Sequence, residues 1–283
     1  MYATDFEYAD KRLSDFDCVT CYLDSKAGVS EIDIGCDITF QTVKNNHSSI
    51  RYKTSASYEN VFSTTFQIMK NPEGKNQNDM YMTYDEVRNL MKWLNCREYN
   101  RFKVLSDDTL EDIHYYGSFN VKQKTYHDRI IGLILTFTGN SPYGFGETIK
   151  NEFDFTEDDF ASTDHVSFHV YGDSDELGNI YPVVTIIPKK DCLQHACEIT
   201  NATTNTAMVL ENLKKDEVVR LDGEHKIITS SDKVHSASTL CNDFNYQWLD
   251  LLISNDSQEN VYTINTPCYI AIEYTPIRKV GVC

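Results

Sequence analysis

The feature that most constrains this chain is a succession of short β patterns separated by turn-forming residues. Apolar and polar residues alternate along segments 31–40 and 60–70, which is the period of a strand with one buried face. In the second half, turn signals recur about every 8–12 residues, the spacing of an antiparallel β-sandwich. The 283 residues are enough for two domains of about 100–180 residues each. The sequence therefore predicts a mainly β protein with two domains.

One segment, 83–95, has the pattern of an α-helix instead. Thr83 is a candidate N-cap, and Glu86 three residues later completes a capping box. The apolar side chains that follow recur at the spacing of one helix face and are expected to face the core; they are Val87, Leu90, Met91, Trp93 and Leu94. This helix is predicted to pack against the strands of the first domain.

The remaining strands of the first half are predicted at 100–105, 113–123 and 129–138. The last of these is apolar on both faces, so we expect it to be a central, buried strand. Turn formers are concentrated in 139–144, directly after it, which favours a domain boundary there. We therefore predict a first domain at 1–139 and a second at 140–283.

The second domain is predicted to contain short strands only. The expected strands are 148–155, 165–170, 183–187, 198–201, 208–211, 218–222, 226–229, 244–253, 261–265 and 268–274.

The charge balance limits the kinds of partner. Asp and Glu exceed Lys and Arg by 43 to 26, a net charge of −17, which argues against binding nucleic acid through its phosphates. No apolar run approaches the ~18 residues that span a bilayer, and the polar N-terminus indicates no secretory signal. The nine cysteines are therefore expected to be reduced, structural thiols.

Motifs for catalysis, nucleotides and metals are missing or incomplete. Phosphate-binding loops, dinucleotide-binding loops and nucleophile elbows do not occur. His165 and His169 lie in a predicted strand, where side chains four apart are about 13 Å from each other, too far to share a metal ion. Asp173, Asp175 and Glu176 only partly match a calcium loop. We expect no catalytic residue, no cofactor and no metal site.

Two places are candidates for contact with partners. The polar loop 72–81, with Pro72, Gly74, Lys75 and Tyr81, is a possible subunit interface, because long loops in compact domains are often functional. A disordered surface loop is an equally good interpretation.

Tyr246 and Trp248 are possible sugar contacts, because exposed aromatic rings can stack on sugars. Their alternation with Phe244 favours one buried face of a strand instead.

The order of short motifs resembles the distal tail proteins of bacteriophages that infect Gram-positive hosts. Residues 8–16 are similar to that family's opening "Y-x-x-x-x-L-S-D-F", and 38–40 to its "I-T-F" strand. Residues 65–72 are similar to "T-F-Q-I-x-K-N-P", 88–95 to "R-x-L-M-x-W-L-N", and 274–281 to the closing "Y-x-P-x-R-K-V-G". No single motif is a catalytic signature, and the weight lies in their common order over nearly the whole chain.

The resemblance implies a tail-tube-like N-terminal domain, a β-barrel or sandwich with one helix, and a galectin-like C-terminal β-sandwich. It also implies a non-enzymatic virion protein, made in the host cytoplasm, that forms a hexameric ring at the tail tip or baseplate. The ring would join the major tail tube protein to the tail-tip hub and to receptor-binding proteins, with DNA only in transit through its lumen. No membrane insertion is implied. The galectin sugar motifs H-x-N-x-R and W-G-x-E-x-R do not occur, so the likeness is one of shape.

Two other functions compete with this one. A carbohydrate-binding adhesin that contacts the host cell wall would bind glycans saturably through exposed aromatic rings. A hydrolase would need a cluster of perturbed carboxylates in a cleft, and no spacing in the sequence indicates one.

Overall fold

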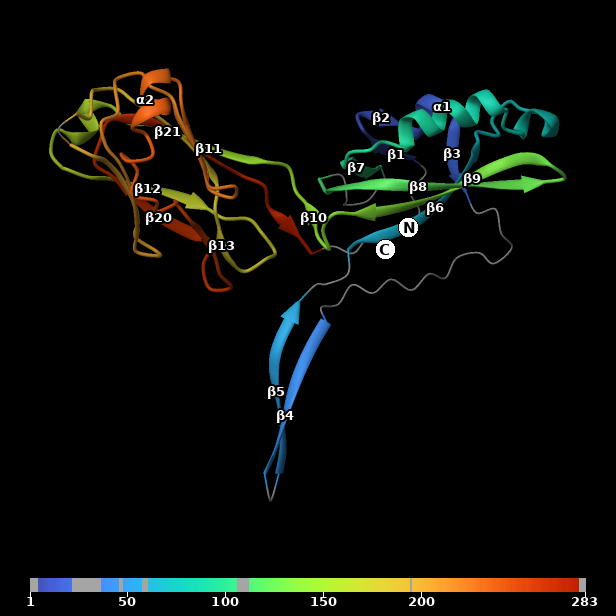
Figure 1. The fold of residues 1–283 in the computed structure, drawn as a ribbon, viewed down its shortest axis with the longest axis horizontal. Helices are drawn as coiled ribbons and strands as arrows, with labels where there is room; N and C mark the ends of the chain where they lie inside the picture. The colour runs from blue at the N-terminus through green and yellow to red at the C-terminus, as the bar shows by residue number, and fades with distance from the viewer. Residues whose placement is uncertain are drawn as a thin grey trace. The chain divides into compact units, whose positions relative to one another are not determined.

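The computed structural model describes residues 5–21, 37–45, 48–57, 61–105, 112–193 and 195–279. The chain divides into two compact units, Met1–Gly146 with Arg278–Cys283, and Glu147–Ile277. This division follows Gly146, whereas the predicted one followed Gly139, because a short strand at Gly144–Phe145 still pairs with the first unit. The prediction of a mainly β protein is confirmed (Figure 1).

The first unit is built on one antiparallel sheet, in which nine strands of the described residues take part. Seven of them follow the order β2-β1-β7-β8-β9-β6-β3, and the short β10 and β22 lie off this path. The sheet is open rather than a closed barrel, since β2 and β3 form its two ends. The strands are β1 (Asp5–Tyr8), β2 (Lys11–Arg12), β3 (Cys18–Cys21), β6 (Ser63–Lys70), β7 (Asn100–Leu105), β8 (His114–Tyr126), β9 (Arg129–Gly139), β10 (Gly144–Phe145) and β22 (Ile277–Arg278).

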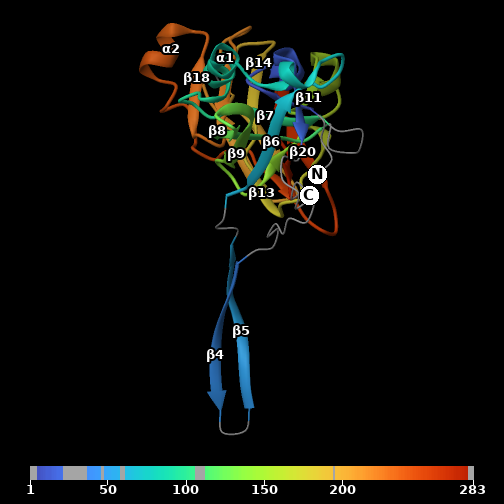
Figure 2. The same ribbon diagram turned by 90° about the vertical axis from the view of Figure 1, so that its right-hand side faces the viewer.

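The predicted helix is confirmed as α1 (Tyr84–Leu94). Thr83 and Glu86 form the expected reciprocal capping box, and Asn95 is the C-cap. The apolar face of α1 packs on one face of the sheet, and the ribbon of α1 lies on one side of that sheet (Figure 1 and Figure 2). Trp93 lies over Phe6 at 5.7 Å between ring centroids and donates its indole N–H to the carbonyl of Tyr8, so its single polar group has a partner in the core.

The strand predicted to be central, β9, lies between β8 and β6. Leu133, Leu135 and Phe137 alternate on its core side and are fully buried. The turn between β8 and β9 contains His127 and Asp128, both with positive φ, which matches the right-handed twist of a hairpin.

Two further strands, β4 (Asp37–Asn45) and β5 (Ser48–Ser57), form a separate antiparallel hairpin. Among the described strands these two pair only with each other. The predicted strand at 31–40 is thus described only from Asp37, and its first six residues lie outside the described ranges.

The described part of the second unit is a β-sandwich. One sheet has five strands in the order β11-β21-β14-β17-β18, the other has four in the order β12-β20-β15-β16, and β13 pairs with β19. The strands are β11 (Ile149–Asp154), β12 (Val166–Tyr171), β13 (Gly178–Ile180), β14 (Val183–Pro188), β15 (Cys197–Asn201), β16 (Thr206–Leu210), β17 (Val219–Asp222), β18 (Ile227–Ser230), β19 (Leu251–Ile253), β20 (Glu259–Ile264) and β21 (Cys268–Tyr274). Both sheets contribute to one shared core.

The prediction that the second domain has strands only is wrong. A short helix, α2 (Lys233–Ser238), follows β18, with Asp232 accepting hydrogen bonds from two backbone N–H groups at its start. The strand predicted at 244–253 is reduced to a single bridge between Phe244 and Leu210 and to β19. Short 3-10 helices occupy Leu13–Phe16 (η1), Gln77–Met80 (η2) and Glu157–Phe160 (η3).

Candidate functional site

The sheet face opposite α1 is a candidate surface of the first unit. It is formed by side chains that are cross-strand neighbours on β8, β9 and β6, and we call it the uncovered face. Its central members are Thr65, Gln67, Ser118, Asn120, Lys122, Ile134, Thr136 and Thr138, all half-buried or exposed. The hydroxyls of Thr65 and Thr136 lie 3.3 Å apart across it. No described helix packs on these side chains.

The charge of this face differs from that of the whole chain. Strands β6, β8 and β9 contain no Asp or Glu, although the chain has 43 such residues. Lys122 is exposed, and the described residues give it no carboxylate partner. The uncovered face is therefore a hydroxyl-rich, amide-rich and weakly basic surface on an acidic protein.

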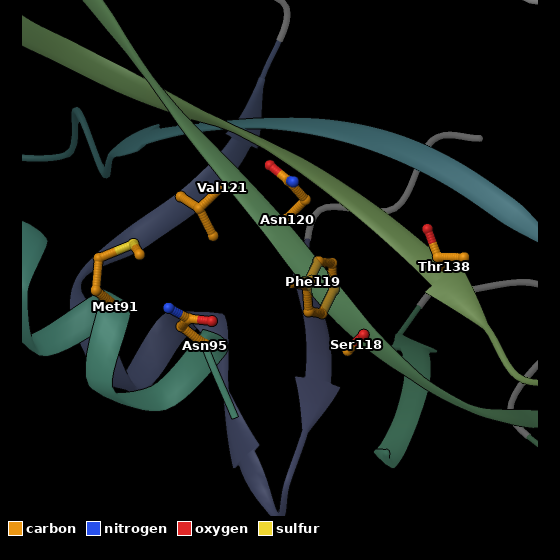
Figure 3. A pocket seen from close by; sticks show the side chains of 7 residues that line it. All are labelled: Met91, Asn95, Ser118, Phe119, Asn120, Val121 and Thr138. Atoms are coloured by element: carbon orange, nitrogen blue, oxygen red, sulfur yellow. The ribbon is translucent and has the colours of Figure 1, made fainter. Parts of the chain in front are cut away.

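A cavity of about 370 Å³ lies at the edge of β8, near the end of α1 (Figure 3). β7 pairs with β8 only as far as Gly117, so the edge of β8 is open from Ser118 onward. The lining residues are Met91, Asn95, Ser118, Phe119, Asn120, Val121 and Thr138. None of them is titratable, so the cavity offers no acid, base or strong nucleophile for catalysis.

Several contacts link the loop 72–81 to the rest of the first unit. The Lys75 ammonium pairs with Asp17 and donates to the carbonyl of Asn71 at 3.0 Å. The backbone N–H of Met82 donates to the carbonyl of Ile130 at 2.8 Å, which anchors the end of the loop on β9.

The four residues singled out in this loop are not equally available. Pro72 and Gly74 are exposed, Gly74 with a φ of 70°. Lys75 and Tyr81 are half-buried, and the Arg129 guanidinium lies 4.9 Å from the centre of the Tyr81 ring. The loop thus presents its tip to solvent, while Lys75 has an internal structural role.

Tyr246 and Trp248 do not share one buried strand face. Tyr246 is 60% exposed and has a φ of 57°, which is incompatible with an extended strand. Trp248 is half-buried against the core of the sandwich. Phe244 contacts both rings, at centroid distances of 5.5 and 5.0 Å.

A cluster of buried titratable groups lies around α2. The two ring nitrogens of His235 lie 2.6 Å from a Glu217 carboxylate oxygen and 3.0 Å from an Asp243 carboxylate oxygen. The Ser230 hydroxyl donates to Glu217. Because His235 is only 5% exposed and both of its nitrogens are engaged, this cluster holds the fold together and cannot reach a substrate.

The seven described cysteines are all free thiols. Burial raises the pKa of Cys18 to about 12 and that of Cys21 to about 11. Burial likewise raises the pKa of Cys192 to about 12. A hydrogen bond with Cys197, together with burial, raises the pKa of Cys268. These thiols stay protonated at neutral pH, which makes them poor nucleophiles and metal ligands.

The histidines considered as metal ligands do not meet. His169 pairs with Glu259 at 2.9 Å, whereas His165 precedes β12 and its backbone contacts Thr163. Within the described ranges, no group of three or more His, Cys, Asp or Glu side chains could hold a metal ion.

Sequence reasoning missed two features of the surface. The lack of Asp and Glu in β6, β8 and β9 was visible in the sequence, but only the sheet order shows that these strands are neighbours. The position of Lys226 beside two aromatic rings is not predictable from the sequence, because Tyr181 and Trp248 are distant from it along the chain.

Comparisons with known proteins agree on one kind of protein. Residues 1–141 match the model of a phage tail protein N-terminal domain, and residues 143–274 match that of a phage tail C-terminal domain. None of the curated proteins matches the chain in sequence. Among the described helices, none is long and apolar enough to cross a membrane.

One solved structure of a phage protein shares the fold. The chain is similar to the Dit (gp 19.1) protein of phage SPP1, presented as a paradigm of the hub adsorption apparatus in Gram-positive infecting phages. The identity is 12% and the TM-score 0.60, over 96% of this chain and 98% of that one. A chain of the phage P2 baseplate in its activated conformation with Ca is also similar, with 11% identity and a TM-score of 0.45, over 99% of both chains.

Proposed function

Since the chain belongs to a family of phage tail proteins, we propose that this structural component of the virion assembles as a hexameric ring joining the tail tube to the tail-tip hub. Its neighbours in the tail would be the major tail tube protein on one side and the hub protein on the other, with receptor-binding proteins attached at the periphery. DNA would pass through the lumen of the ring without being bound.

The observation that carries the proposal is the uncovered face of the first unit. Every copy carries a net charge of −17, so contact between acidic surfaces of two copies is repulsive. A face with hydroxyl and amide groups, with Lys122 and without carboxylates can lie against an acidic neighbour favourably. Repeated head-to-tail contacts of this kind close into a ring when the rotation between copies allows it.

Two other features support assembly. The β4–β5 hairpin pairs with no other described strand, and its backbone edges are available for a neighbouring sheet. The loop 72–81 presents Pro72 and Gly74 to solvent on an anchored base, so we propose its tip as a further subunit contact. The fold shared with SPP1 Dit, a hub adsorption protein, supports a place at the tail tip.

We further propose that the chain catalyses no reaction. The cavity beside β8 lacks titratable groups, and the buried His235 cluster has no exposed nitrogen. The competing function, an adhesin for host carbohydrate, has one specific observation in its favour, the exposed Tyr246, and it concerns the second unit.

The test is the molar mass of the purified protein by light scattering over a concentration series, with negative-stain images of the heaviest species. Wild-type protein is expected to reach six times the monomer mass and to form rings with a central hole. Lys122→Glu should shift the distribution toward monomer, because it adds a carboxylate to the contact face.

Lys215→Glu is the matched control, since Lys215 is exposed on the second unit and the change in charge is the same. The proposal fails if the wild type stays monomeric at every concentration, including when the tail tube protein is added. Equal masses for Lys122→Glu and the wild type would exclude the uncovered face as the contact.

A further inference from the structure

A lysine between two aromatic rings marks a second surface, on the β-sandwich unit. The Lys226 ammonium lies 3.7 Å from the centre of the Tyr181 ring and 5.1 Å from the centre of the Trp248 ring. Lys226 and Tyr181 are exposed, Tyr181 to 42%. The three side chains come from three separate segments, so the cluster exists only in the folded unit.

The backbone fixes the position of Lys226. It ends the turn between β17 and β18 with a φ of 59°, a left-handed conformation that is uncommon for residues other than glycine. At Gly223, in the same turn, a Cβ would lie 2.7 Å from the Pro182 carbonyl oxygen and 3.0 Å from the Tyr181 Cβ. The turn therefore packs directly against the segment that carries Tyr181, and the ammonium is held over the ring.

Trp248 connects the cluster to Phe244 and, through Phe244, to Tyr246. The Asn245 side chain accepts a hydrogen bond from the Gln247 backbone N–H at 3.1 Å and donates to the carbonyl of Ala207 at 2.9 Å. This turn places Tyr246 on the surface, and its ring contacts Phe244, which also contacts Trp248. A ligand would meet aromatic side chains that lose little conformational freedom on binding.

Lys226 has no anionic partner among the described residues. The carboxylate of Asp222, four positions away, is engaged by His225, whose Nδ1 lies 3.0 and 3.1 Å from its two oxygens. Burial lowers the pKa of Lys226, and no nearby carboxylate opposes this effect. On a chain with a net charge of −17, an ammonium held on ring faces without a counter-charge is a place for an external anion.

We propose that Lys226, Tyr181 and Tyr246 form a binding site for an acidic sugar, that is, a saccharide carrying a carboxylate or phosphate group. The Lys226 ammonium pairs with the anionic group, and the exposed Tyr246 ring stacks against the C–H face of the sugar. The Trp248 ring stabilises the ammonium by a cation–π contact. Cations over aromatic rings are stabilised by the ring quadrupole, and they keep their capacity to pair with an anion.

The surroundings favour a small polar ligand over a protein partner. The exposed neighbours in the two turns are mainly polar; they are Glu224, His225, Asn245 and Gln247. In protein–protein interfaces, the residues that contribute most of the binding energy lie in a central patch from which water is excluded. The exposed polar neighbours of this site do not form such a patch.

The experiment is a titration of the full chain monitored by NMR at the Trp248 indole N–H. The chain has two tryptophans, and Trp248→Phe assigns the signal. The probes are glucuronate, glucose 6-phosphate, glucose, inorganic phosphate and a short oligoglutamate peptide. Glucuronate and glucose 6-phosphate are expected to shift the signal saturably and to bind at least fivefold more tightly than glucose or phosphate.

Variants separate the contribution of the Lys226 charge to sugar binding from that of the Tyr246 ring. Lys226→Gln should weaken both acidic sugars at least fivefold, Lys226→Arg should retain them, and Tyr246→Ala should weaken both. Lys215→Gln is the control for loss of one exposed lysine, and a dispersed spectrum verifies that each variant is folded.

Three outcomes would overturn the proposal. One is unchanged affinity in Lys226→Gln. Another is inorganic phosphate binding as tightly as glucose 6-phosphate, which would leave an anion site without sugar recognition. The third is binding of the oligoglutamate peptide without either sugar, which would assign the surface to a protein partner. None of these readouts depends on ring formation.

Discussion

At the scale of single residues, the strongest polar arrangement of the protein is buried rather than displayed. His235 lies between Glu217 and Asp243, which also receive hydrogen bonds from the Lys214 backbone N–H and the Asn212 side chain. The histidine therefore bridges two separate segments of the chain, because each of its ring nitrogens has a carboxylate partner.

Replacing this histidine tests its role. His235→Ala is expected to lower the free energy of unfolding by about 1–3 kcal/mol, because the buried Glu217 and the half-buried Asp243 then both lose their bond to the imidazole. Urea denaturation followed by circular dichroism measures the change. Ser236→Ala, at an exposed position of the same helix, should stay within about 0.5 kcal/mol of the wild type. A small effect of His235→Ala would mean that the carboxylates reach solvent in the variant.

At the scale of elements, the sheet of the first unit depends on close approach between β8 and β9. A Cβ at Gly117 would lie 2.3 Å from the Thr138 carbonyl oxygen and 2.5 Å from the Phe137 ring. The Phe137 ring is stacked on Phe102 at 4.4 Å, so it cannot move aside without disturbing the core. Only glycine fits at this position of β8.

Gly117→Ala is therefore expected to destabilise the protein by about 1–3 kcal/mol, the usual range for overpacking a core. Thermal unfolding monitored by circular dichroism provides the measurement. The neighbouring Ser118→Ala places a small side chain on the opposite face and should change stability by less than about 0.5 kcal/mol. If both variants unfold alike, the backbone shifts to accommodate the methyl group.

At the scale of the whole molecule, each unit has its own hydrophobic core. The core of the first unit is rich in aromatic rings, whereas that of the second is mostly aliphatic and includes both sheets of the sandwich. Compact units with separate cores are expected to fold independently.

A fragment of residues 147–277 is accordingly expected to fold alone and to unfold cooperatively. Circular dichroism with a urea titration, compared with the same signal in the full chain, checks this. A broad, non-cooperative transition of the fragment would show that the second unit needs the first for its stability.

Local patterns were sufficient for much of the fold. The capping box of Thr83 and Glu86 and the helical spacing that follows predicted α1 to within a residue at each end, because caps and periodicity act within a few residues. The apolar run 130–135 predicted the central place of β9, but only one face of the strand is buried, because Ile134 and Thr136 are half-buried and Thr138 is exposed. The mainly β fold and the phage tail resemblance also came from the sequence.

What only the tertiary structure decided are the arrangements that join distant segments. The alternation at Phe244, Tyr246 and Trp248 predicted a strand, but the Asn245 side chain bonds to the backbone of β16 and turns the chain outward there. A side chain that bonds to the backbone of another strand in this way overrides the periodicity of the sequence.

The two candidate surfaces depend likewise on sheet order. Sheet order brings Lys226 to Tyr181 and Trp248, and it places the three strands without carboxylates side by side. The sequence by itself determined the elements, and packing between them determined the surfaces, because contacts between residues far apart in the chain follow from the fold as a whole.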